Sequence, residues 1–115
     1  MGGDESPTEL FALLDDAYAR AILTATSSQP MSAKTLSEEC DASLPTVYRR
    51  VDRLIDCGLL AEQTEVAEDG HHYSVYSARL ERLTVELEDG DLQVTLEQAP
   101  ADDVADRFTD LWEGI

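Results

Sequence analysis

The sequence predicts an α+β fold in which a helical N-terminal half is followed by two β-hairpins and a final helix. Three observations lead to this prediction. Apolar residues recur at helical spacing through the first half of the chain. Further on, they alternate with polar residues in two pairs of runs, each pair joined by a turn. Residues 101–114 return to helical spacing, and a length of 115 residues suits one compact domain.

The chain is strongly acidic, with 25 Asp and Glu against 8 Lys and Arg, a net charge of −17 and Lys34 as its only lysine. Such a surface opposes DNA binding, because the duplex carries about one negative charge per 1.7 Å. At about 1 M salt the Debye length falls to roughly 3 Å, so general repulsion is screened while direct arginine contacts persist. Abundant carboxylates with almost no lysine are typical of extreme halophiles. An acidic protein-binding module is the competing explanation.

No segment suggests secretion, membrane insertion or a disulfide framework. The N-terminus, residues 1–5, is acidic rather than basic and then apolar, and no apolar run could span a bilayer. We therefore expect a cytoplasmic protein without membrane contact. Cys40 and Cys57 are too few for a disulfide framework, and we expect reduced, buried thiols rather than a redox switch.

The first expected element is one long helix that runs to about Thr26. Residues 6–9 offer a capping serine, a proline at the first helical position and a glutamate three residues after the cap. After a break rich in serine and proline, Ser32 can cap a short second helix that ends at Cys40. Lys34, in the first turn of that helix, is a candidate phosphate contact, with a free surface lysine as an equal alternative.

A third helix is expected at about residues 43–57. Four of its residues share one stripe at i, i+3, i+4 and i+7, namely Thr46, Arg49, Arg50 and Arg53. The opposite side is apolar and consists of Val47, Val51, Leu54 and Ile55. The stripe thus holds three of the 8 basic residues. Contact with phosphates and guanine edges requires such a concentration of positive charge, whereas a solvated face on an ordinary core helix is the alternative.

The second and third helices are joined by the short turn Asp41-Ala42, after which Ser43 can cap the third helix. A short helix, a tight turn and a longer helix with a basic stripe form the helix-turn-helix arrangement. There the N-terminal half of the second of these helices enters the major groove of DNA. Gly58 can take the left-handed conformation that closes this recognition helix.

Residues 59–66 and 71–77 favour β-structure and are joined by a turn that ends in Asp69-Gly70. A hairpin directly after a recognition helix is a wing, and wings commonly lie along the DNA backbone or in the minor groove. Here the tip is acidic. We interpret His71 and His72 as wing surface and as candidate phosphate contacts. A metal site is disfavoured, because it would need further ligands at compatible spacing.

A second hairpin turns at Asp89-Gly90, with alternating apolar residues on both sides. The last helix carries a broad apolar stripe that must be covered, namely Val104, Phe108, Leu111, Trp112 and Ile115. It can dock on its own domain or on the same helix of a second subunit. We expect the second arrangement, a homodimer, because it sets two recognition helices one DNA turn apart. Residues 79–115 then extend the DNA-binding part, residues 1–78.

Residues 21–23, 32–36, 44–50 and 54–60 resemble winged helix-turn-helix transcriptional regulators of the ArsR-like group, particularly the acidic versions of halophilic archaea. The resemblance covers about residues 8–78, and residues 79–115 resemble an extension of some haloarchaeal members. It implies three helices with a hairpin wing and operator DNA bound by Ser43, Leu44, Thr46, Tyr48, Arg49, Arg50 and Arg53. It implies no metal sensor, because residues 29–32 stand where metal-sensing members carry a cysteine pair.

The leading hypothesis is a homodimeric, sequence-specific regulator of double-stranded DNA, without enzymatic activity, metal or cofactor, in which Arg49 or Arg50 reads guanine. The sequence identifies no small-molecule effector. The alternative is a winged-helix adaptor that docks proteins through its acidic faces or the Trp112 helix and keeps its arginines paired with carboxylates. An enzyme is disfavoured because no nucleophile elbow, phosphate loop or paired acid and base is present.

Overall fold

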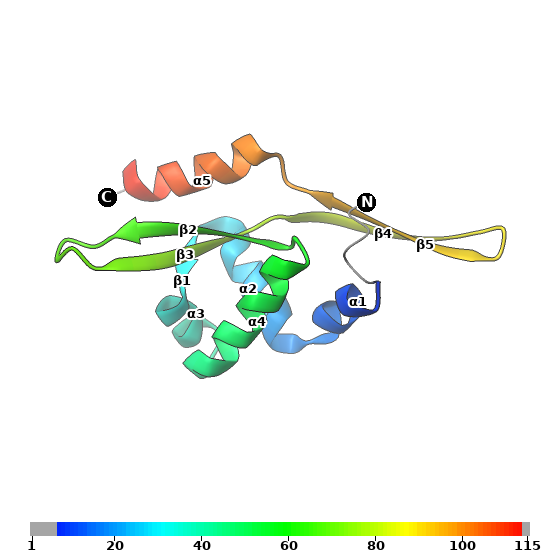
Figure 1. The fold of residues 1–115 in the computed structure, drawn as a ribbon, viewed down its shortest axis with the longest axis horizontal. Coiled ribbons are helices and arrows are strands. Elements are labelled where there is room, and N and C mark those ends of the chain that lie inside the picture. Colours follow the sequence, from blue (N-terminus) through cyan, green and yellow to red (C-terminus); the bar gives the residue numbers. More distant parts are fainter. Residues whose placement is uncertain (1–6, 114–115) are drawn as a thin grey trace.

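The computed structural model describes residues 7–113, with the side chains of residues 7–109 (Figure 1). In chain order its elements are α1 (Pro7–Asp15), α2 (Ala17–Ser28), β1 (Met31–Ser32), α3 (Ala33–Glu39), α4 (Leu44–Asp56), β2 (Leu60–Val66), β3 (His72–Ala78), β4 (Leu80–Glu88), β5 (Asp91–Gln98) and α5 (Ala101–Glu113). The α+β class is confirmed. Helices α1 to α4 lie on one side of the β2–β3 hairpin, and α5 lies on the other (Figure 1). None of the described helices is long and apolar enough to cross a lipid bilayer.

The single long N-terminal helix expected from the sequence is wrong, because the chain breaks at Asp16. This residue has extended backbone angles, φ −87° and ψ 122°, and its carboxylate accepts the Ala19 N–H at 2.8 Å. The Asp16 carboxylate thus satisfies the Ala19 N–H, which would bond to a backbone carbonyl if the helix were continuous. The expected cap at Ser6 lies outside the described residues.

The main core lies between the four N-terminal helices and the β2–β3 hairpin. Its fully buried side chains come from every one of these helices and from the start of β2, and include Leu13, Ile22, Leu36, Val47, Leu54, Leu59 and Leu60. The apolar side predicted for the third helix is confirmed, since Val47, Val51 and Leu54 are buried in α4 and Ile55 is partly buried against the same core. Cys57 is buried in this core and Cys40 is half-buried against it.

Strands β1, β3 and β2 form an antiparallel sheet in that order. The β2–β3 hairpin directly follows α4, with register from Leu60 opposite Ala78 to Val66 opposite His72. The short strand β1 pairs Ser32 with Val75, so it ties the start of α3 to the hairpin. The expected wing is therefore present as a hairpin.

The β4–β5 hairpin projects away from the body of the molecule (Figure 1). Asp89 and Gly90 form its turn with positive φ angles of 53° and 85°, as a two-residue type I′ turn requires. At its base, Gln98 Nε2 donates to the Gly58 carbonyl at 2.8 Å. Gly58 itself has φ 77°, so it ends α4 in the predicted left-handed conformation.

Helix α5 packs on its own domain. Val104 and Phe108 are 7% and 5% exposed and form a small core with Val75 of β3. The expectation that these two side chains dock on a second subunit is therefore wrong. The far face of the β2–β3 hairpin needs a cover, and α5 supplies it within the chain. The other members of the predicted stripe, Leu111, Trp112 and Ile115, lie outside the described side chains.

Candidate nucleic-acid interface

The turn between α3 and α4 is held by hydrogen bonds that fix the start of α4. Ser43 Oγ accepts the Thr46 N–H at 3.3 Å and donates to Thr46 Oγ1 at 2.9 Å. In the turn, Asp41 adopts a positive φ of 52°, and the Ala42 N–H donates to the Ser37 carbonyl at 3.1 Å. Ser43 and Thr46, predicted as DNA contacts, therefore first serve as the cap of this helix.

The N-terminal half of α4 presents an open face to solvent. Leu44 is 42% exposed, Tyr48 is 50% exposed, and Arg49 is also exposed. Arg49 forms no ion pair with any residue that the structure describes. At about 100° per residue, Arg49 lies about 160° away from Val47, on the side of the helix opposite the core. It is the one arginine of the predicted stripe that points away from the body.

Arg50 was expected to face outward, and this is wrong. Its Nε lies 3.0 Å from Asp16 Oδ2, both side chains are about four-fifths buried, and its guanidinium lies 5.9 Å from the centroid of the Tyr18 ring. The helical step explains the result, because Arg50 is only about 60° around the helix from Val47, at the edge of the core face. Arg50 thus joins α4 to the α1–α2 junction.

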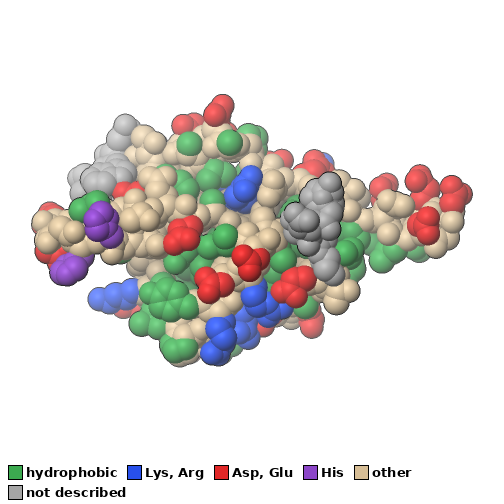
Figure 2. Space-filling view, in the orientation of Figure 1, with side chains coloured by type: hydrophobic (Ala, Val, Ile, Leu, Met, Phe, Trp, Pro, Cys, Tyr) green, Lys and Arg blue, Asp and Glu red, His purple; other side chains and the backbone are tan. Residues whose placement is uncertain are grey.

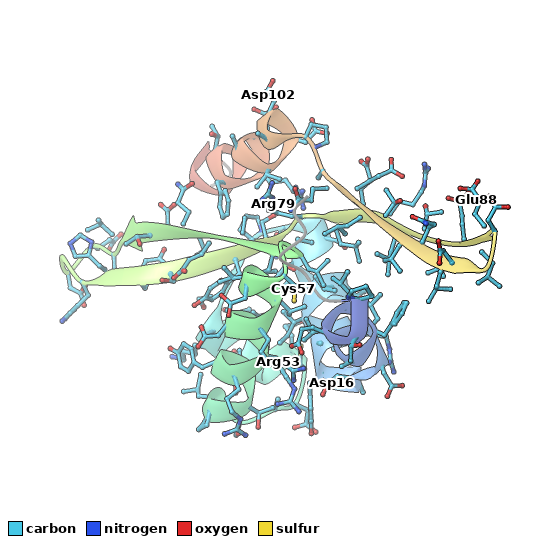
Figure 3. The ribbon with its side chains drawn as sticks, turned by 45° about the vertical axis from the view of Figure 1, so that its right-hand side comes forward. Asp16, Arg53, Cys57, Arg79, Glu88 and Asp102 are labelled. Atoms are coloured by element: carbon cyan, nitrogen blue, oxygen red, sulfur yellow. The ribbon has the colours of Figure 1, made fainter. Side chains whose placement is uncertain are left out.

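Arg53 makes a similar connection to α1, although its side chain stays partly exposed. Its Nε lies 2.8 Å from Glu9 Oε2, and the two side chains are 41% and 40% exposed. Figure 3 shows Arg53 on the side of α4 nearest Asp16. The hydrogen bond to Glu9 raises the pKa of Arg53, which strengthens its hold on the proton. Two of the three arginines of the stripe are therefore engaged within the fold.

These contacts lower the pKa of the Asp16 carboxylate. Partial burial raises its pKa, but the Ala19 N–H and the Arg50 guanidinium lower it by more, so the net pKa lies below the ordinary value. A depressed pKa means that the folded state favours the ionised form. The junction therefore depends on a charged Asp16.

A groove of about 480 Å³ lies between α3, α4 and β3. It brings together three predicted DNA contacts from separate elements: Lys34, Tyr48 and His72. The sequence interpretation missed its other lining residues, which are Ser32, Ala33, Tyr73, Ser74 and Tyr76. Alternation along the strand could have predicted Ser74 and Tyr76, because side chains two residues apart share one face of a strand and His72 was already a candidate. The pairing of β1 with β3, which carries α3 to this place, had no signal in the sequence.

Hydroxyl groups line the groove, and the carboxylate of Glu62 lies next to two of them. Ser74 Oγ donates to Glu62 Oε2 at 2.6 Å, which links β3 to β2. Burial, and then the nearby Glu62 charge, raises the pKa of Tyr76, so its phenol stays protonated and can donate a hydrogen bond. Figure 2 shows Lys and Arg side chains on the lower part of this face, over α3 and α4, with Asp and Glu side chains close above them.

The two histidines of the wing do different things. His71 Nδ1 lies 2.8 Å from Asp69 Oδ2, and the His71 backbone N–H donates to Asp69 Oδ1 at 3.0 Å. These bonds lower the pKa of Asp69, so a charged carboxylate stays at the wing tip. His72, one residue on, lies in the groove instead. Of the predicted pair, only His72 is therefore placed beside Lys34 and Tyr48.

Metal and thiol chemistry receive no support from the described part of the chain. No cluster of three or more His, Cys, Asp or Glu there could hold a metal ion. Burial, and then the Glu39 charge, raises the pKa of the Cys40 thiol, which disfavours the reactive thiolate.

Residues 14–63 match the family model of a helix-turn-helix domain. The matched stretch contains α2, α3, α4 and the start of β2. A comparison with curated proteins found no match. The capped helix α4, the tight turn before it and the family match together support a helix-turn-helix DNA-binding domain.

Proposed function

We propose that this protein is a sequence-specific transcription regulator that binds double-stranded DNA as a homodimer, with the N-terminal half of α4 in the major groove. The observation that carries the proposal is the open face of α4, where Arg49 stands exposed on the helix of a helix-turn-helix match. The likeness to winged regulators of the ArsR-like group from halophilic archaea supports the same function. No enzymatic activity and no bound metal or cofactor are part of the proposal.

Arg49 is the proposed reader of a guanine edge, and Leu44 and Tyr48 are the proposed apolar contacts beside it. A guanidinium can donate two hydrogen bonds to guanine O6 and N7. Across the groove, Lys34 and His72 reach toward the DNA backbone. Lys34, Tyr48 and His72 come from three elements that the fold brings to one groove, which supports a contact surface shared by α3, α4 and β3.

Arg50 and Arg53 receive a different role in this proposal. They set the angle of α4 on α1 and α2 through Asp16 and Glu9. A recognition helix must hold a fixed angle, because base contacts depend on distances of about 3 Å. These arginines therefore act as positioning residues rather than as DNA contacts.

Strong salt is the condition in which such an acidic protein can approach DNA. The net charge of −17 repels phosphate at low ionic strength. At about 1 M salt, repulsion beyond roughly 3 Å is screened, while a direct hydrogen-bonded arginine contact is retained. The acidic wing tip at Glu68 and Asp69 remains outside the minor groove in this arrangement.

The test uses duplexes selected from a random DNA library at about 1 M KCl. Arg49→Ala should lower affinity for the selected site by the equivalent of about 1–3 kcal/mol and relax one base position. Arg82→Ala is the matched control, because this side chain is 68% exposed on β4 and is not part of α4 or of the groove. Equal effects of the two substitutions, or none from Arg49→Ala, would contradict the assignment of Arg49.

A protein-interaction adaptor is the second candidate, and a specific observation favours it. Two arginines of the α4 stripe are paired with carboxylates, as an adaptor would keep them. Against it stands Arg49, which no described carboxylate neutralises. An adaptor would select no DNA sequence and would protect no DNA at any salt concentration.

A further inference from the structure

A cleft of about 280 Å³ lies between α5 and the β2–β3 hairpin, apart from the groove described above. Its apolar walls include Ala61 of β2 and Val104 and Phe108 of α5, and its polar groups are Gln63 and Arg79. We call it the α5 cleft. It lies on the side of the hairpin opposite α4, so a molecule bound there does not occupy the proposed DNA surface (Figure 1).

Arg79 brings to this cleft a positive charge that the described part of the chain does not neutralise. The side chain is half-buried, and it forms no ion pair with any Asp or Glu that the structure describes. Its Nη2 donates to a neutral acceptor, Gln98 Oε1, at 3.3 Å. Figure 3 shows Arg79 between the sheet and α5, with Asp102 on the outer side of that helix. The α5 cleft therefore contains a guanidinium available to an anion.

A buried hydroxyl lies on the same face of the sheet. Ser77 is fully buried, and its Oγ has no hydrogen-bond partner among the described residues. Ser77 is the cross-strand partner of Ala61, which lines the cleft, and it precedes Arg79 by two residues. Cross-strand partners share one face of a sheet, as do residues two apart in a strand. A buried donor without a partner destabilises the fold, so a ligand oxygen that reached Ser77 would be favoured.

The carboxylate of Glu65, on the same strand as Gln63, does not line the cleft. Glu65 is 4% exposed, and its Oε2 accepts a hydrogen bond from Gln63 Nε2 at 2.8 Å. The amide of Gln63 thus satisfies this buried carboxylate at the border of the cleft. Among the charged side chains, it is Arg79 that lines the cleft itself.

The charge and size of the cleft restrict its ligand. A guanidinium can donate two parallel hydrogen bonds to a carboxylate or a phosphate. One guanidinium balances one negative charge, whereas a doubly charged phosphate would add further charge to a chain of net charge −17. The apolar walls favour a ligand with an apolar body. The volume of 280 Å³ is just below the roughly 300–1,000 Å³ of pockets for drug-sized ligands, so the ligand is small.

We propose that the α5 cleft binds a small monocarboxylic acid with an aliphatic or aromatic body. The carboxylate lies against the Arg79 guanidinium and accepts a hydrogen bond from Ser77 Oγ, and the body packs on Val104 and Phe108. Ser77 is closed to solvent, so α5 shifts slightly outward when the ligand enters. The small core of Val75, Val104 and Phe108 that holds α5 on the sheet makes such a shift feasible. This inference does not depend on DNA binding.

The test titrates the isotope-labelled full chain with benzoate, phenylacetate and hexanoate in about 1 M KCl and follows the backbone amide chemical shifts. At least one acid should saturate a single site with a dissociation constant below about 1 mM. The shifts should occur at Ala61, Gln63 and Ala105 and not in α4. Benzamide, which lacks the charge of benzoate, and inorganic phosphate, which lacks an apolar body, should bind at least about tenfold more weakly.

Variants assign the binding to named side chains. Arg79→Gln should weaken binding at least about tenfold. The matched control is Arg82→Gln, since Arg82 is 68% exposed on β4 and does not line the cleft, and it should bind like wild type. Ser77→Ala should bind at least about threefold more weakly yet melt no lower than wild type, because it removes a buried hydroxyl without a partner. Ala105→Leu should block the cleft from an exposed helical position without a loss of helix.

Thermal melts show which variants keep the fold. The inference is overturned if none of the three acids saturates, if benzamide binds as tightly as benzoate, or if the shifts lie in α4. Wild-type affinity in Arg79→Gln overturns it as well. Should Arg79→Gln fail to fold, Ala105→Leu decides, because unchanged binding in that variant excludes the α5 cleft. Unchanged binding in Ser77→Ala overturns the two-donor geometry.

Discussion

Arg50 Nε lies 3.0 Å from Asp16 Oδ2, so helix α4 is joined by an ion pair to the residue that separates α1 from α2. Asp16 also caps α2 through the Ala19 N–H. The Asp16 carboxylate thus caps the start of α2 and also anchors α4 through Arg50. The charge of Arg50, which the sequence analysis assigned to DNA binding, instead holds α4 against the α1–α2 junction.

Substitution of Asp16 should separate its two roles. Asp16→Ala loses both the cap and the ion pair and should lower the free energy of unfolding by about 1–2 kcal/mol from the cap alone. Asp16→Asn keeps a side-chain acceptor for the Ala19 N–H but loses the charge, so it should cost less. Urea unfolding at high KCl measures both. Equal losses for the two variants would show that the cap contributes nothing.

Acid should weaken the same junction. The pKa of Asp16 is lower in the folded state than its ordinary value of 3.8. Its ionised form therefore stabilises the fold above that pH, and this contribution is lost as the pH falls through the lower folded pKa. The stability difference between wild type and Asp16→Asn, followed by urea midpoints from neutral pH to about pH 3, should shrink toward the acid end. A constant difference would contradict the ionised pair.

Gly58 should be the least replaceable glycine among those that the structure describes. It has φ 77°, and a Cβ there would lie 2.6 Å from Gln98 Nε2, so Gly58→Ala must strain the backbone and displace the Gln98 bond. We expect a loss of about 2 kcal/mol, from strain of about 1–2 kcal/mol and the lost bond. Gly70→Ala is the control, with φ 88° but nothing within 4 Å of its Cβ. Thermal melts in which both variants lose the same stability would contradict the contact.

Phe108 should matter to the stability of each subunit rather than to its pairing. This side chain is 5% exposed against Val75, and truncation of a buried Phe costs about 3–5 kcal/mol. Phe108→Ala should therefore reduce the hydrogen-exchange protection of β3 and α5. The molar mass at high KCl should stay that of wild type, because Phe108 packs within its own chain. A shift to monomer in this variant would restore α5 as the dimer contact.

Much of the fold could be predicted because its signals are local. The alternation on either side of Asp89-Gly90 is enough to predict a hairpin, and the positive φ angles at both residues agree. The sequence gives no signal for the break at Asp16, because apolar periodicity continues across it and neither glycine nor proline lies there. Which surface covers α5 also could not be predicted, because periodicity shows an apolar stripe but not its partner.

The sequence predicted one stripe of DNA-binding side chains on α4, but spacing at i, i+3, i+4 and i+7 does not separate outward side chains from those at the edge of the core. Thr46, Arg49, Arg50 and Arg53 were treated as one face, although about 100° of helix separates Arg49 from Arg50. That step places Arg49 in solvent and Arg50 against Asp16. The partners Asp16 and Glu9 are more than 30 residues distant in the chain, so no local pattern could identify them. Lys34, Tyr48 and His72 were named individually, and only the tertiary fold shows that they share one groove.

The most direct test of the central claim is the ratio of wild-type affinities for a selected DNA site and for a scrambled duplex of the same length and composition. Fluorescence anisotropy at about 1 M KCl provides both affinities under screened conditions. We predict a ratio of at least about 1,000 in favour of the selected site, within the range of specific regulators. Equal affinity for the two duplexes, or no binding to either, would contradict the account.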